Sequence, residues 1–359
     1  MIRPIRWSSA CGRIVQISLA GKTRRALGFV RRQALFRLGV GRDDPVVLMY
    51  HRIASPPFDP WGLCVSPENF REQLLALKAD RPIMAMDDLV GAIEAGRVPP
   101  RAVALTFDDG YADNVTHAKP ILEELQIPAT IFVTTAFIGE ARPFWWDELA
   151  ALVLGAIGAA EVDCEVAGVC FQARWPAQET LPPDLVHWRA HHRASDPRRQ
   201  AYVLWWQALQ AKAAADRDRA MAELRLRLGD VERAPPDIGA PMIEAQVREL
   251  SSALLSLGGH GRTHAPLPQL TPAEREYEIV GGRGELTVLT GEAPHGFAYP
   301  HGEWDAATRE AVIRAGYSWA VTTRAAKVDV HRADKFALPR VKVMDWSGPA
   351  ALRAMRSGI

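Results

Sequence analysis

The sequence has few cysteines and no long apolar run. Its 359 residues include four cysteines, whose spacing matches neither a zinc-binding pattern nor a disulfide framework. No window approaches the roughly 20 apolar residues that a membrane-spanning helix needs. The N-terminus is basic but lacks an apolar core before a small-residue cleavage site. We therefore expect a reduced, cytoplasmic protein without a secretory signal.

An excess of charge of one sign is also absent. The chain carries 43 lysines and arginines against 42 acidic residues, a formal net charge of +1. This balance argues against nucleic-acid binding through bulk charge. Residues 23–38, within a basic N-terminal extension of residues 1–44, are a local exception, because arginines border an apolar helical face there. This amphipathic helix is expected either to pack on the domain or to make peripheral contact with a membrane.

Short apolar runs alternate with segments of helical pattern over residues 45–350. Strands that alternate with helices pair in parallel, and about eight runs favour a barrel over an open sheet. The sequence therefore predicts an α/β fold with a barrel of parallel strands. The runs are residues 45–50, 82–85, 102–107, 129–134, 254–259, 296–299, 318–323 and 336–343.

Residues 151–250 interrupt the alternation. They contain a hairpin with its tip at residues 167–168, a proline-rich stretch and a long charged helix. We interpret this part as a mixed hairpin and helical insertion that covers one end of the barrel. Trp205 and Trp206 are interpreted as helix-packing residues rather than sugar-binding platforms.

Two adjacent carboxylates, Asp108 and Asp109, follow a buried strand in the stretch LTFDDGY. Neighbouring like charges repel, and each loses solvation in an enclosed site. A solvated Asp-Asp-Gly turn is the simplest interpretation. The alternative is that one aspartate binds a cation while the other handles a proton, which requires partners elsewhere in the chain.

Candidate partners occur in the stretch LGGHGRTH, which contains His260 and His264. On a helix this spacing would suggest a zinc protease, but that motif needs a glutamate where Gly261 stands. Gly258, Gly259 and Gly261 favour a loop instead. Two imidazoles and one carboxylate would form a three-ligand metal site with room for water and substrate.

Further residues follow other predicted strands. His51 comes directly after the run VVLMY, and Pro300 ends the run FAY. In a parallel barrel the C-terminal ends of the strands share one face, where active sites are built. We therefore expect His51 and Pro300 to lie near the Asp-Asp and His-x-x-x-His motifs.

Three motifs occur along the chain in the order TFDDG, HGRTH and FAYPHG. In these motifs the sequence resembles the polysaccharide deacetylases, the homology group of the chitooligosaccharide deacetylase of nodulation. The resemblance runs from about Val46 to Val343, with the insertion unmatched. It implies a distorted (β/α) barrel and metal-dependent removal of N-acetyl or O-acetyl groups from a sugar or polysaccharide.

The resemblance also implies roles for individual residues. Asp109, His260 and His264 would bind one divalent metal ion, with zinc expected, and Asp108 would be the catalytic base. A backbone N–H near Tyr111 would hold the oxyanion. The expected substrate contacts are Tyr111, Tyr299 and Pro300.

The sequence departs from the family pattern at several places. Gly261 replaces the usual Ser or Thr after the first metal histidine, and Ala298 replaces an arginine that orients the base. Arg340 is a candidate substitute for that arginine, with an ordinary strand-end arginine as the alternative. The late Leu-x-His that supplies the general acid is absent, so His51 is predicted as the acid, with His301 next.

Two other functions are compatible with these residues. Two histidines and one carboxylate also suit a non-haem iron oxygenase, although paired aspartates give such an enzyme no benefit. The missing late histidine also suits a catalytically degenerate carbohydrate-binding protein. The sequence does not distinguish polymeric from nucleotide-linked or lipid-linked acetylated sugars.

Overall fold

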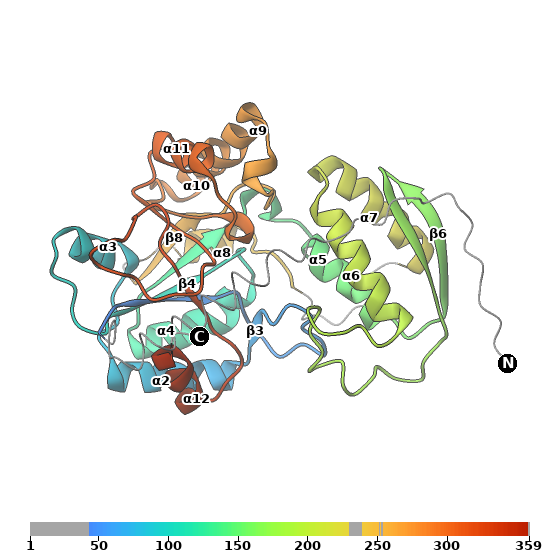
Figure 1. The fold of residues 1–359 in the computed structure, drawn as a ribbon, viewed down its shortest axis with the longest axis horizontal. Helices are drawn as coiled ribbons and strands as arrows, with labels where there is room; N and C mark the ends of the chain where they lie inside the picture. The colour runs from blue at the N-terminus through green and yellow to red at the C-terminus, as the bar shows by residue number, and fades with distance from the viewer. Residues whose placement is uncertain (1–42, 230–238, 251, 253, 358–359) are drawn as a thin grey trace.

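The structure is a computed structural model that describes residues 43–229, 239–250, 252 and 254–357. The predicted amphipathic segment 23–38 lies outside the described residues. Figure 1 shows a large α/β body and, beside it, a smaller lobe formed mainly by residues 144–228. None of the described helices combines the length and the apolar character needed to cross a bilayer.

A parallel sheet of seven strands, in the order β10-β9-β8-β5-β4-β1-β11, forms the centre of the α/β body. Every residue of β1, β4 and β5 is buried, because helices cover the outer face and side chains fill the inner one. The strands are β1 (Val46–Tyr50), β4 (Val103–Phe107), β5 (Ala129–Val133), β8 (Leu255–Gly259), β9 (Gly296–Ala298), β10 (Trp319–Val321) and β11 (Val341–Lys342).

The segment that leads into β11 joins the two edges of this sheet. Leu338 bridges to Val321 of β10, and β11 itself pairs with β1 at the other edge. The sheet therefore curls into a distorted barrel, which confirms the predicted fold class. The prediction of a strand at 82–85 is wrong, since only Ile83 forms a bridge, to Val103, before a helix begins at Met86.

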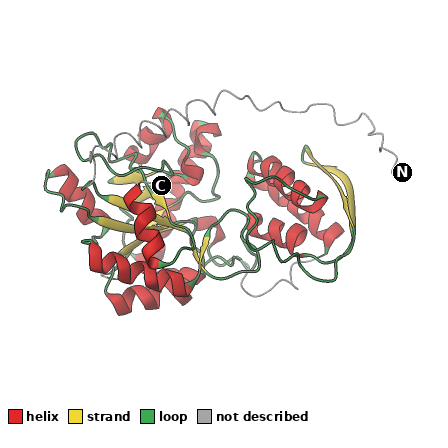
Figure 2. Ribbon diagram, turned by 60° about the horizontal axis from the view of Figure 1, so that its bottom comes forward, coloured by secondary structure: helices red, strands yellow, loops and turns green. Residues whose placement is uncertain are grey.

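Helices surround the sheet (Figure 2). The first of them shows why these segments are helical: Ser66 caps its N-terminus by accepting a hydrogen bond from the Asn69 N–H, and Phe70, Leu74 and Leu77 form its buried face. The helices are α2 (Pro67–Asp80), α3 (Met86–Glu94), α4 (Lys119–Leu125), α8 (Glu244–Leu250), α9 (Pro272–Glu276), α10 (Gly282–Thr290), α11 (Ala306–Arg314) and α12 (Gly348–Ser357). A short parallel pair, β2 (Arg52–Ile53) and β3 (Cys64–Val65), lies beyond the end of β1.

The lobe has its own hydrophobic core and contains the predicted hairpin. Ala167 and Gly168 form the hairpin tip, both with positive φ, as a two-residue turn of this kind requires. The expected long charged helix is two helices, separated by residues 211–213. The elements of the lobe are α5 (Trp145–Ala150), β6 (Ala160–Val166), β7 (Val169–Trp175), α6 (Pro197–Gln210) and α7 (Ala214–Leu228).

The limits of the lobe differ from the insertion predicted at 151–250. The lobe begins earlier, because Trp145 and Trp146 of α5 pack in its core. It also ends earlier, because Val247 and Leu250 of α8 pack in the core of the barrel.

Candidate active site

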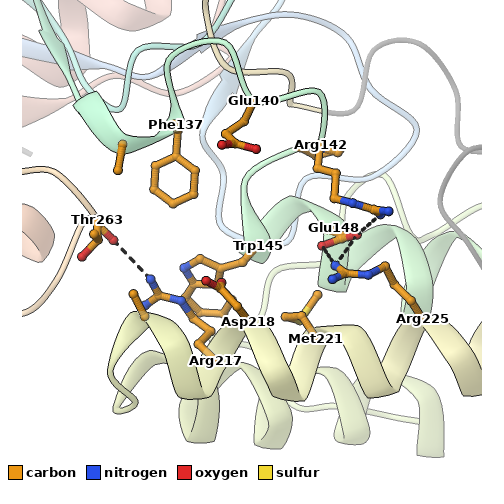
Figure 3. Close-up of a pocket in the computed structure, with 13 residues that line it drawn as sticks. Phe137, Glu140, Arg142, Trp145, Glu148, Arg217, Asp218, Met221, Arg225 and Thr263 are labelled. Atoms are coloured by element: carbon orange, nitrogen blue, oxygen red, sulfur yellow. Dashed lines mark hydrogen bonds and ion pairs between the residues drawn. The ribbon is translucent and has the colours of Figure 1, made fainter.

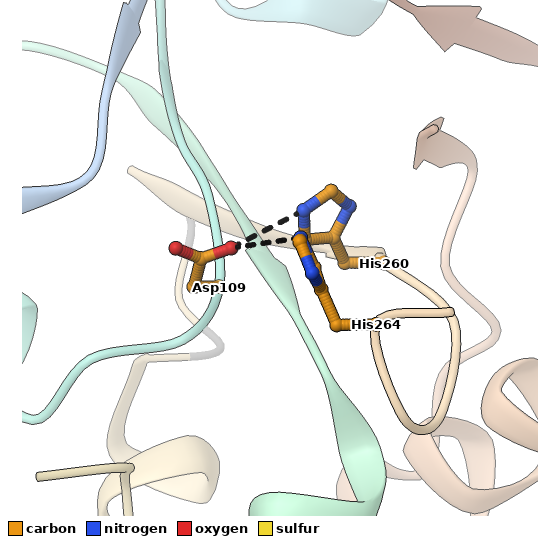
Figure 4. A group of neighbouring side chains, drawn as sticks. All are labelled: Asp109, His260 and His264. Atoms are coloured by element: carbon orange, nitrogen blue, oxygen red, sulfur yellow. Dashed lines mark ion pairs between the residues drawn. The ribbon is translucent and has the colours of Figure 1, made fainter. Parts of the chain in front are cut away.

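Asp109, His260 and His264 form a compact group of potential metal ligands (Figure 4). Asp109 Oδ1 lies 3.3 Å from His260 Nε2 and 3.4 Å from His264 Nε2, and all three side chains are buried. Asp109 follows the end of β4, while both histidines lie in the loop after β8. The structure therefore brings together the three residues expected to bind metal.

The protonation of these side chains fits metal binding. His260 Nδ1 lies 2.7 Å from the Ala298 carbonyl oxygen, so this nitrogen carries the proton and Nε2 keeps its electron pair for a ligand bond. Burial, together with His301 and His260, lowers the pKa of His264 well below its usual value and keeps the ring neutral. Two imidazole nitrogens and one carboxylate oxygen suit a zinc ion.

The backbone is unusual at the same place. Asp109 and His264 adopt positive φ angles of 76° and 57°, and His301 beside them has a φ of 58°. Positive φ is uncommon outside glycine and costs energy that the surrounding structure must supply. Conformations of this kind are found preferentially at functional sites, which agrees with the placement of the three side chains.

Arg340 reaches across the barrel to Asp108. Its Nη1 and Nη2 atoms lie 2.6 Å from Asp108 Oδ1 and Oδ2, and Nη1 also donates to Thr106 Oγ1 at 3.0 Å. The guanidinium is completely buried, and its Nε donates to the Thr322 carbonyl oxygen at 3.0 Å. Burial alone would raise the pKa of Asp108, but Arg340, together with His260 and His51, outweighs burial, and the pKa lies below its usual value. Arg340 thus makes the two-atom contact with the Asp108 carboxylate that Ala298 cannot make.

His51 lies beside Asp108, and His301 lies beside His264. His51 Nε2 is 4.0 Å from Asp108 Oδ2, and burial lowers the pKa of His51. The His301 ring packs 4.3 Å from the ring of His264, and burial lowers the pKa of His301 to about 4. Of the two histidines considered as general acid, His51 is therefore the one beside Asp108.

Glu278 holds the loop that carries the metal histidines. Its carboxylate accepts hydrogen bonds from the Arg262 N–H at 2.7 Å, from the Thr263 N–H at 2.9 Å and from Thr263 Oγ1 at 2.7 Å. A β-carbon on Gly261 would lie 3.0 Å from Glu278 Oε2, and Gly261 has a φ of +73°. Gly261 therefore fits this loop, and Glu278 braces the loop instead of the Ser or Thr side chain expected at position 261.

The three expected substrate contacts differ in their positions. Tyr299 lines the cavity above the metal group. Pro300 is buried and lies close to Gly261 instead of lining that cavity. The Tyr111 ring is buried too, and its hydroxyl donates to Asp147 Oδ2 at 2.7 Å, so the side chain is not available to a substrate. The Tyr111 N–H donates to no atom of the described residues, which leaves it available for the oxyanion.

Several residues of the cavity were not anticipated. The cavity has a volume of about 380 Å³ and contains His51, both aspartates and both metal histidines. Its remaining wall includes Trp61, Trp146, Trp206 and Lys342, and Gln210 lies 3.2 Å from His301. No motif ties these residues to the site, although the sequence has two Trp-Trp pairs. Trp205 packs inside the lobe as predicted. Trp206 packs against Trp61 and Trp145, as predicted too, but it also lines the cavity.

A second cavity lies between the lobe and the barrel loops (Figure 3). Arg217 of α7 donates to the Thr263 carbonyl oxygen at 3.3 Å, and its guanidinium lies 5.1 Å from the Trp145 ring. Glu148 of α5 forms an ion pair with Arg225 at 2.8 Å. The hydrogen bond from Arg217 connects the lobe to the residue that precedes His264.

Comparisons with known proteins show which family this chain is similar to. The family model "Polysaccharide deacetylase" matches residues 95–156 and 227–320. The poly-beta-1,6-N-acetyl-D-glucosamine N-deacetylase of Staphylococcus epidermidis is 34% identical over 119 residues, which cover 30% of this chain and 41% of that protein. The chain therefore spans about two fifths of the length of the curated relatives it matches. The matched segments contain Asp108, Asp109, His260 and His264, so the similarity to the polysaccharide deacetylase family includes the residues of this site.

Solved structures agree on the fold. IcaB from Ammonifex degensii superposes with a TM-score of 0.53 at 20% identity, covering 88% of this chain and 98% of that one. The Streptococcus pyogenes deacetylase PplD, solved with acetate, has a TM-score of 0.51 at 18% identity, covering 87% of this chain and 98% of that one. At these identities the likeness shows a shared fold.

Proposed function

We propose that this protein is a metal-dependent hydrolase that removes the acetyl group from an N-acetylated sugar unit of an oligosaccharide or polysaccharide. The observation that carries the proposal is the buried Arg340–Asp108 pair beside Asp109, His260 and His264. This arrangement places an ionised base and a group of potential metal ligands in one cavity. The match to an N-deacetylase of a glucosamine polymer supports the substrate class.

Asp109, His260 and His264 would hold one divalent ion, with zinc expected. When bound, the ion would polarise the amide carbonyl and make a water molecule easier to deprotonate. Asp109 is committed to this ion, so Asp108 remains free to accept the proton of the attacking water. Arg340 keeps Asp108 ionised and in a fixed orientation.

The other steps need a donor for the oxyanion and a donor for the leaving group. The unused Tyr111 N–H is the donor proposed for the oxyanion as water adds to the carbonyl carbon. The C–N bond then breaks, and the nitrogen needs a proton because an amide anion is a poor leaving group. His51, 4.0 Å from Asp108, is the proposed donor. The products are acetate and a free amino sugar.

The deciding experiment measures bound metal and acetate release together, with and without dioxygen, on a panel of N-acetylated and O-acetylated sugars. His264→Ala should lose both metal and activity. Asp108→Asn should keep the metal but lose about 10²-fold or more in kcat, because an amide cannot accept the water's proton. His295→Ala is the matched control, since this histidine is exposed at the start of β9.

Full metal occupancy in His264→Ala would overturn the ligand assignment, and normal turnover in Asp108→Asn would overturn the base. A strict oxygen requirement would favour the oxygenase. Bound metal with no turnover on the panel would favour a carbohydrate-binding protein.

A further inference from the structure

One face of α6 lies along the active-site cavity. Tyr202, Trp206 and Gln210 are spaced four residues apart and therefore share this face. Tyr202 accepts a hydrogen bond from Trp61 Nε1 at 2.7 Å, and the Trp206 ring lies 4.2 Å from the Trp61 ring. Gln210 Nε2 lies 3.2 Å from His301 Nδ1. The face thus runs from Trp61 at one end to the metal group at the other.

Trp206 is placed to contact a ligand, unlike its neighbour in the sequence. Trp205 is buried in the lobe, where its ring packs against Phe171 at 5.3 Å. Trp206 is only partly buried and lines the same cavity as Asp108 and His264. Its indole N–H makes no hydrogen bond within the described residues, so the ring contributes contact area rather than a polar anchor.

The position of Trp206 along α6 indicates what it would contact. Trp206 lies one helical turn from Gln210, about 6 Å along the axis. Gln210 lies beside His301, which packs on His264 of the metal group, so a ring on Trp206 is displaced from this end by roughly the size of one sugar unit. Trp61, Leu63 and Trp146 line the same cavity and make this part of it apolar and aromatic. The C–H face of a pyranose ring is a chemical match for such a surface.

We propose that Trp206, with Trp61 beside it, binds the sugar unit adjacent to the one that is deacetylated. The inference rests on the proposed function. It assigns to the insertion a subsite for an uncharged sugar ring and predicts a preference for oligosaccharides over single sugars. The family model matches neither tryptophan, because its two segments cover residues 95–156 and 227–320.

The test compares two substitutions that keep the side chain apolar. Trp206→Leu removes the flat ring but still fills space against Trp61, whereas Trp206→Phe keeps a ring. For a tetramer of N-acetylglucosamine, Trp206→Leu should raise KM about tenfold with kcat changed less than twofold. The monomer should lose less than threefold in kcat/KM. Trp206→Phe should stay within threefold of wild type on both substrates.

Leu204→Ala is the control for changes to α6, because Leu204 is exposed on the same helix away from the cavity. Its kinetics should match wild type. An equal loss on monomer and tetramer in Trp206→Leu, or an unchanged KM for the tetramer, would overturn the subsite. Thermal unfolding of each variant shows whether the lobe stays folded, and Trp206→Phe provides the comparison if Trp206→Leu is destabilised.

Calorimetric binding of a β-1,4-linked glucose tetramer, which is uncharged and has no acetyl groups, separates this inference from the proposed function. If wild type releases no acetate yet binds this tetramer about tenfold more tightly than Trp206→Leu, the subsite stands and the proposed reaction fails. If wild type is an active deacetylase and both proteins bind the tetramer equally, the reaction stands and the subsite fails.

Discussion

The barrel side of the cavity consists mainly of charged and titratable groups, among them a buried ion pair with several hydrogen bonds, whereas the lobe side consists mainly of aromatic rings. Arg340 alone donates to Asp108, Thr106 and the Thr322 carbonyl. On the lobe side, the Trp206 indole N–H has no partner among the described residues. Buried charges require such networks because leaving them unpaired is costly. An aromatic ring is stabilised by contact alone, so the residues around it can vary more than the residues around a buried charge.

This difference assigns separate tasks to the two regions. Substitutions in the barrel are expected to change kcat, the protonation of the site or metal binding. Substitutions in the lobe are expected to change KM and the preference for substrate length.

Arg340→Met should have the largest effect on the barrel side. It leaves Asp108 buried without its ion pair, and loss of one partner of a buried pair costs about 3–5 kcal/mol. We expect a lower Tm and a kcat reduced about 10²-fold. Because Asp108 loses the group that lowers its pKa, the acidic limb of the pH–rate profile should move to higher pH.

Calorimetry and the pH dependence of acetate release measure these effects. Arg324→Met is the matched control, because Arg324 is exposed and contacts Arg340 only through its backbone carbonyl. An unchanged acidic limb in Arg340→Met would show that Asp108 does not limit the rate at low pH.

His51→Ala should reduce kcat by about 10²-fold, the usual contribution of general acid catalysis. A histidine donates a proton only when charged, and burial lowers the pKa of His51 below its usual value of 6.5. The charged fraction therefore falls as the pH rises through a value below 6.5, which predicts a basic limb in that range. His51→Ala should lose this limb with its metal content unchanged. If His301→Ala loses the limb while His51→Ala keeps it, His301 is the acid.

Glu278→Ala should weaken metal binding about tenfold, because it removes three hydrogen bonds from the loop between His260 and His264. At saturating metal, kcat should recover to near the wild-type value. Competition with a chelator measures the affinity. Glu276→Ala, an exposed glutamate two residues earlier, should bind metal as wild type does. Equal affinities in both variants would show that Glu278 does not brace the loop.

The barrel and the candidate metal ligands could be predicted from sequence because the patterns that indicate them are local. Asp108 and Asp109 follow an apolar strand directly, and the glycines around His260 exclude a helix. The C-terminal ends of parallel strands must share one face, so the parallel direction of the strands is enough to bring these residues to one face of the barrel. Arg340 could be proposed only because the expected arginine was missing at position 298.

The lobe side of the cavity carried no comparable signal. Trp205 and Trp206 are adjacent and chemically identical, yet one packs inward and the other faces the cavity. Which of them faces the site depends on how α6 is rotated against the barrel, and that rotation is set by tertiary packing. Glu278 was missed for a similar reason: it follows Thr263 by 15 residues, and only tertiary packing turns its side chain toward the metal loop.

The smallest expected effect on catalysis is at Asp147, where the barrel meets the lobe. Asp147 accepts a hydrogen bond from the Tyr111 hydroxyl and lies 3.9 Å from the Arg52 guanidinium. Burial raises its pKa from 3.8 to about 7. The folded protein therefore binds this proton more tightly than the unfolded chain, and this residue's contribution to stability decreases as the pH rises from about 4 to about 7.

Asp147→Asn should remove this decrease, because the amide stays neutral and still accepts the Tyr111 hydrogen bond. One pKa unit corresponds to about 1.4 kcal/mol. Between pH 4 and pH 8 this residue should therefore cost wild type up to about 4 kcal/mol of unfolding free energy, and the variant should gain that amount over wild type at pH 8. Denaturant unfolding at both pH values measures the gain, with the exposed Asp163→Asn as control. A kcat within twofold of wild type would show that the junction serves stability. A large fall in kcat would instead show that barrel and lobe do not act separately, since Asp147 contacts the barrel through Tyr111 and Arg52.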